Sequence, residues 1–94
     1  MAAHKLQGEG QLEVDRAPLV AARYDIAVME VGHRHDGQGR LYSDEQALFN
    51  ALRAGEATLI LENGLKVAIV LTNHIAKSRE AEFVTYGPVP IPNV

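Results

Sequence analysis

The sequence predicts a single small α+β domain, built as a five-stranded antiparallel sheet or small β-barrel with one helix, in the order β-β-α-β-β-β. The segment 56–71, EATLILENGLKVAIVL, holds two apolar, β-branched runs separated by Asn63-Gly64, which is the pattern of a β-hairpin. Asp44–Ala54 has apolar residues at helical spacing, whereas the remaining apolar runs are short and mostly alternate. A chain of 94 residues with 47% hydrophobic content can build one core without a disulfide, and it contains no cysteine.

Two strands are predicted in the first third of the chain. Gly10–Asp15 alternates, with Leu12 and Val14 on one face, and Pro18 interrupts the pattern because proline lacks the N–H that a strand ladder needs. Leu19–Val31 is a longer strand whose second face, with Arg23, Asp25 and Ala27, is expected to be solvated. Its apolar face consists of Val20, Ala22, Tyr24, Ile26 and Val28.

A polar loop and the helix follow. Gly32–Arg40 contains three glycines and is predicted to be a loop. Ser43 and Gln46 have the spacing of a capping box, so a helix is expected over Asp44–Ala54, and Gly55 would end it. The stripe that should face the core is formed by Ala47, Leu48, Ala51 and Leu52.

The hairpin is apolar on both faces. Asn63-Gly64 predicts a two-residue type I′ turn, because both positions tolerate positive φ. One helix can cover only one face of this hairpin, so the other face must be covered by barrel closure or by a partner. Unless the barrel closes, the second apolar face therefore favours association. Barrel closure would also remove exposed sheet edges. Thr72–Glu80 is a second polar loop, and Ala81–Tyr86 is the last strand.

The domain is predicted to occupy residues 10–87. Residues 1–9 are expected to form a flexible N-terminus, since they are polar and have no apolar run. Residues 88–94 form an extended tail with proline at every second position from Pro88 to Pro92, which suits a sheet edge or a groove.

Charge and composition narrow the classes of function. The net charge of −3 and the absence of a basic stripe do not favour nucleic-acid binding. No apolar run approaches the ~20 residues that span a bilayer, and the lack of cysteine fits a soluble cytoplasmic protein. No cofactor motif is present, because the glycines of the first loop do not complete a dinucleotide-binding pattern.

The two polar loops carry most of the candidate ligand-binding residues. Basic side chains in both loops could form an anion-binding surface beside the helix N-terminus, provided the loops converge. If the helix lies along the strands, the loops sit at opposite ends of the molecule instead. The candidates are His33, Arg34, His35 and Arg40 in the first loop, with His74 and Arg79 in the second.

The first loop also suggests a metal site. Two imidazoles and a carboxylate, His33, His35 and Asp36, could begin a zinc or nickel site that needs further ligands from elsewhere. No nucleophile–base pattern is legible, because Ser43 is better placed as a helix cap. The sequence therefore leaves enzymatic activity open but does not favour it.

The favoured function is non-enzymatic: protein binding or self-association, with a homodimer as one form. One alternative is a metal- or anion-binding site in Gly32–Arg40, including an enzymatic one. Another is a small barrel that binds single-stranded nucleic acid, although Tyr24, Phe83 and Tyr86 are too few and too dispersed to form an obvious stacking platform.

Overall fold

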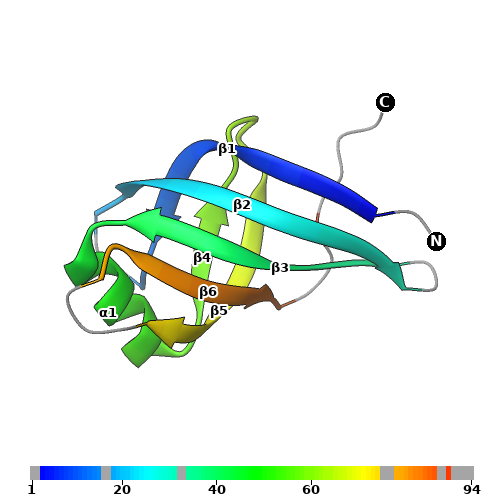
Figure 1. Cartoon of the computed structure of the whole chain (residues 1–94). Coiled ribbons are helices and arrows are strands. Elements are labelled where there is room, and N and C mark those ends of the chain that lie inside the picture. Colours follow the sequence, from blue (N-terminus) through cyan, green and yellow to red (C-terminus); the bar gives the residue numbers. More distant parts are fainter. Residues whose placement is uncertain (1–2, 16–17, 32–33, 75–77, 87–88, 90–94) are drawn as a thin grey trace.

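The computed structural model describes residues 3–15, 18–31, 34–74, 78–86 and 89. Within this part the chain forms a closed antiparallel barrel of six strands with one helix at one end (Figure 1). Around the barrel the order is β1-β2-β3-β6-β5-β4, and β4 returns to β1. This confirms the predicted α+β class and small barrel. The elements are β1 (Ala3–Glu13), β2 (Val20–Val31), β3 (Arg34–Ser43), α1 (Glu45–Ala54), β4 (Ala57–Ile60), β5 (Lys66–His74) and β6 (Glu80–Thr85).

β3 is a strand that the sequence did not predict, and it brings the total to six. It occupies most of the predicted loop Gly32–Arg40, so the loop assignment and the count of five strands were wrong. β3 pairs with β2 along its whole length and with β6 over Gln38–Tyr42. Its glycines mark close packing rather than a turn. A Cβ on Gly39 would lie 1.9 Å from the carbonyl oxygen of Asp25, so only glycine allows this approach to β2.

β1 is also longer than predicted. It begins at Ala3 and pairs with β2 from Ala3 to Leu12, so most of the predicted flexible N-terminus is strand. The alternation is present in the sequence, with Lys5, Gln7 and Glu9 exposed. Two glycines occupy inward positions between Leu6 and Leu12, and the apolar half of the pattern is therefore hard to recognise.

Helix α1 is where the sequence places it, but its N-cap is Asp44 rather than Ser43. The Asp44 carboxylate accepts hydrogen bonds from the backbone N–H groups of Gln46 (3.0 Å) and Ala47 (3.2 Å). The Ser43 hydroxyl instead donates to the carbonyl oxygen of Ala21 at 2.8 Å, which ties the end of β3 to β2. Gly55 ends the helix with φ 84°, as predicted.

Asp44→Ala is expected to destabilise the protein by about 1 kcal/mol, because two N–H groups of the first helical turn lose their acceptor. Urea unfolding followed by circular dichroism measures this change. Glu45→Ala is the matched control, since it removes a neighbouring exposed carboxylate that caps nothing. Equal losses in both variants would assign the effect to general charge near the helix rather than to the cap.

The β4–β5 hairpin confirms the predicted pairing but corrects the turn. The loop has three residues, 62–64, closed by Leu61 N–H to Leu65 O and Gly64 N–H to Leu61 O, both 2.8 Å. Gly64 alone has positive φ there (89°), so the turn resembles a type I turn with a glycine bulge rather than type I′. Asn63 contributes through its side chain, which accepts from Leu65 N–H at 3.0 Å.

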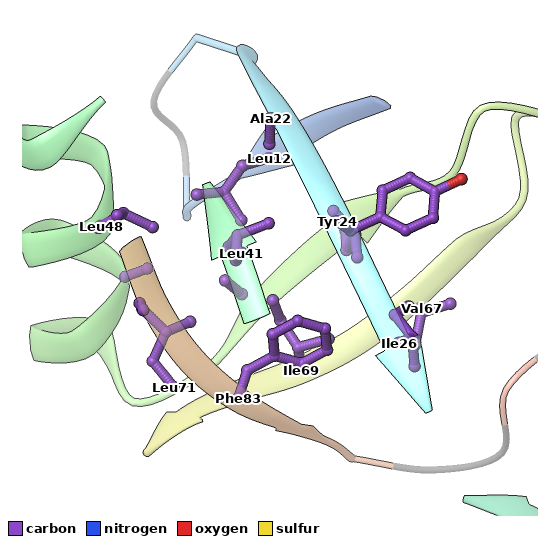
Figure 2. Packing of buried hydrophobic residues seen from close by; sticks show 14 of the residues in the cluster. Leu12, Ala22, Tyr24, Ile26, Leu41, Leu48, Val67, Ile69, Leu71 and Phe83 are labelled. Carbon is purple, nitrogen blue, oxygen red and sulfur yellow. The ribbon is translucent and has the colours of Figure 1, made fainter. Parts of the chain in front are cut away.

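The core fills the barrel, and Leu48 of α1 points into one end of it (Figure 2). Leu59 and Val67 of the hairpin face this core, while Ile60 and Val70 lie half-buried on the outside. Barrel closure thus covers the inner hairpin face, and the two-sided apolar pattern no longer argues for association. The largest fully buried side chains are Phe83, Leu12, Ile26, Leu41, Leu48, Leu59 and Ile69.

Candidate functional site

Of the two polar segments predicted to carry a ligand site, the described part of Gly32–Arg40 runs along most of β3, whereas Arg79 and Glu80 of the second lie beside the C-terminal end of β3. Arg34 and His35 open the strand, with their backbones opposite Val31 and Glu30. Arg79 lies beside the other end, where its carbonyl accepts from the N–H of Ser43 at 3.0 Å. At ~3.3 Å per residue, roughly 30 Å of strand separates Arg34 from Arg79, so the start of the first segment does not converge with the second. Arg40, at the end of the first segment, does approach it, because its Nη1 is 3.9 Å from the Glu80 carboxylate. His33 and the side chains of Arg34 and His35 lie outside the described part.

Arg40 lies in a hollow of about 460 Å³ on the outside of β2, β3 and β6. Its guanidinium Nη1 is 3.9 Å from the carboxylate of Glu80, and Lys5 Nζ is 3.9 Å from that of Asp25. Glu82 also lines the hollow. Each described cation here has a carboxylate nearby, so the hollow does not present the net positive charge that favours an anion.

Arg79 lines a neighbouring hollow of about 490 Å³ with Glu9, Arg23 and Glu80. Here too the charges are mixed. The Arg23 guanidinium stacks over the Tyr42 ring, with its carbon 4.9 Å from the ring centroid. These residues form an exposed outer face with alternating charge.

His74 lies at the end of β5. Its Nε2 is 2.8 Å from the carbonyl oxygen of Ser78, and because a carbonyl only accepts, Nε2 carries the proton. Its Nδ1 is buried without a hydrogen-bond partner among the described residues. Asp36 lies within β3, opposite Met29. No cluster of three or more potential metal ligands occurs in the part of the chain that the structure describes. The predicted site at His33, His35 and Asp36 falls partly outside that part and stays a prediction.

The feature that sequence reasoning missed is the open edge of β1. β4 pairs with β1 only over Gln11–Glu13. From Ala3 to Gly10, β1 pairs with β2 on one side, and no described strand pairs with its other side. The first part of β1 and the last part of β2 lie side by side and extend beyond the end of the shorter strand β4 (Figure 1). Every second residue of this open edge directs its N–H and C=O away from β2.

A hollow of about 270 Å³ lies beside the open edge. It is formed by Leu6, Gln7 and Tyr24 on one side and by the residues of the hairpin turn, from Leu61 to Asn63, on the other. Tyr24 is 5% exposed, and its hydroxyl accepts from the N–H of Glu62 at 3.0 Å. This hydrogen bond ties the hairpin turn to β2, the strand paired with β1.

Tyr24→Phe is expected to destabilise the protein by about 1 kcal/mol and to speed exchange of the Glu62 amide hydrogen, because that N–H loses its acceptor. Denaturant unfolding and amide exchange by NMR test both effects. Tyr42→Phe is the control: it keeps a ring beneath Arg23 and changes the outer face only. Unchanged exchange at Glu62 in Tyr24→Phe would show that the hydroxyl does not hold the turn.

The sequence does contain a signal for this edge. The polar side of the alternation, Lys5, Gln7 and Glu9, leads into the strand that Leu12 makes evident, although glycines replace apolar residues at the inward positions 8 and 10. The run is longer than the four residues of β4, its neighbour in the barrel. A long strand beside a short one leaves part of its edge unpaired.

Comparison of the chain with protein-family models, with curated proteins and with solved structures finds no match. Among the described residues, the structure contains no helix with the length and apolar character needed to span a membrane.

Proposed function

We propose that this protein is a non-enzymatic binding module that takes up an extended polypeptide segment as an added strand on the open edge of β1. The single observation that carries the proposal is the stretch Ala3–Gly10, which among the described strands is paired on one side only, in an otherwise closed barrel. A row of unpaired backbone donors and acceptors is a template for another strand.

The surroundings of the edge support strand addition over the alternatives. A strand placed beside β1 would run past the hollow between Leu6 and the hairpin turn, which can take a side chain of the added strand. Main-chain hydrogen bonds would provide affinity, and this hollow would provide selectivity. The outer face near Arg40 and Arg79 carries mixed charge, which gives less support to an anion or nucleic-acid ligand.

The proposal is tested with a synthetic peptide of residues 3–11, AHKLQGEGQ, titrated into the isotope-labelled protein at low protein concentration. We expect saturable NMR shifts centred on 3–10 and slower exchange at alternate amides of that stretch, since only every second N–H faces the edge. The matched control is the same peptide N-methylated at alternate backbone positions, which keeps the side chains but removes ladder donors.

Two results would count against strand addition. Equal binding of the N-methylated peptide would show that side chains rather than ladder hydrogen bonds hold the ligand. Amides of 3–10 that are protected without any peptide, at every protein concentration, would show that the chain covers this edge itself. A scrambled peptide of the same composition separates general strand binding from recognition of this sequence.

A further inference from the structure

We infer that the strand received by β1 is the β1 strand of a second copy of this chain, added antiparallel with the two-fold axis at Gln7. This inference rests on the proposed function and names its partner. An antiparallel pair of identical strands is isologous, so every residue pair between the two copies occurs twice, once on each side of the axis. The charges along β1 then decide which register is acceptable.

The outer face of β1 presents Lys5, Gln7 and Glu9, all exposed. With the axis at Gln7, Lys5 lies opposite Glu9 of the second copy, Gln7 opposite Gln7, and Glu9 opposite Lys5. Both charged pairs are therefore opposite in sign, and opposite charges directly across a ladder stabilise it. Within the protomer Glu9 is already opposite Arg23, so the row of side chains from Arg23 through Glu9 to Lys5 of the second copy alternates in charge.

Other arrangements lose this match. Parallel pairing in register places Lys5 against Lys5 and Glu9 against Glu9. An antiparallel axis at Lys5 also sets two lysines together, and an axis at Leu6 leaves Lys5 opposite the neutral Gln7. The side chains of one strand alternate between faces, so registers shifted by a single residue place outward side chains opposite inward ones and are excluded.

The inner face of β1 places Leu6 beside filled space in this register. Leu6, which is half-buried in the protomer, would lie opposite Gly8 of the second copy. A Cβ on Gly8 would lie 2.7 Å from the Tyr24 hydroxyl and 2.9 Å from Glu62 Oε2, so that inner position is already occupied within the protomer. Leu6 of the second copy would therefore pack against Tyr24 and Glu62 at the side of the hollow that they line.

The test is sedimentation equilibrium of the full chain from about 10 μM to 1 mM, because a contact limited to one strand pair is expected to be weak. The unmodified protein should dimerise. Lys5→Glu and Glu9→Lys should each weaken the dimer roughly tenfold, because each places like charges at both symmetric positions. The double variant Lys5→Glu/Glu9→Lys should recover the dimer, since it keeps the net charge and restores opposite signs across the axis.

Lys66→Glu is the matched control, because it makes the same charge change on an exposed lysine of β5, away from the edge. Mixing the two single variants should give a one-to-one heterodimer, which keeps the test decisive where the double variant folds poorly by circular dichroism. A monomer throughout the range, or a double variant as weak as the single ones, would overturn this inference. Strand addition itself would still stand if the scrambled or β1 peptide binds the edge, and would fall if neither does.

Discussion

Phe83→Ala is expected to destabilise the barrel by about 4 kcal/mol, the largest effect we predict for a single side chain. Phe83 is 1% exposed and lies on β6 opposite Gly39 on one side and Leu71 on the other. Figure 2 shows its ring in the middle of the core, near Leu41 and Ile69. Removing the ring forfeits apolar burial and leaves a cavity that neighbouring strands, held by their ladders, cannot close. Guanidinium unfolding measures the change.

Val84→Ala is the matched control for Phe83→Ala. Val84 is the next residue on β6 but lies on the outer face and is 37% exposed, so its truncation should cost less than about 1 kcal/mol. The contrast tests the register of β6, because a slip of one residue would exchange the two faces of the strand. Similar costs for the two substitutions would therefore contradict the position of Phe83 inside the barrel.

The parts of the fold that were predicted correctly depend on local sequence signals. Helix α1 was predicted from its apolar spacing and Gly55, and the β4–β5 pairing from two apolar runs around Asn63-Gly64. β2 was predicted from an alternation without interruption over Leu19–Val31. In each case the residues that predict the element lie within the element itself, so no distant contact is needed to recognise it.

The elements that were missed depend on distant packing. The glycines of β3 suggested a loop, and nothing local reveals that the backbone of Asp25 lies against Gly39. The open edge depends on the mismatch between β1 and the much shorter β4, which are far apart in the chain. The polar residues around Arg40 and Arg79 were evident in the sequence, but the β3–β6 pairing that sets Arg40 near Glu80 and leaves Arg34 at the far end of β3 was not.

Gly10→Ala is expected to destabilise the protein by about 3 kcal/mol, because it inserts a methyl group into backbone that is already in contact. A Cβ on Gly10 would lie 1.9 Å from the carbonyl oxygen of Ile60. Ile60 belongs to the three residue pairs, Gln11–Glu13 with Thr58–Ile60, that close the barrel between β1 and β4. The substitution must separate these strands, so amide exchange at 58–60 should accelerate together with the loss of stability in denaturant.

Gly64→Ala separates this steric effect from the general cost of replacing a glycine. Gly64 has φ 89°, and a methyl group added there would meet no described atom within 4 Å, so alanine costs only backbone strain, about 1 kcal/mol. Gly10 is the last residue of the open edge Ala3–Gly10, and its backbone lies against Ile60 where the pairing of β1 with β4 starts. If Gly10→Ala costs no more than Gly64→Ala, β1 does not pass this close to Ile60. The barrel seam would then lie elsewhere, and the stretch of β1 available to a second strand would change with it.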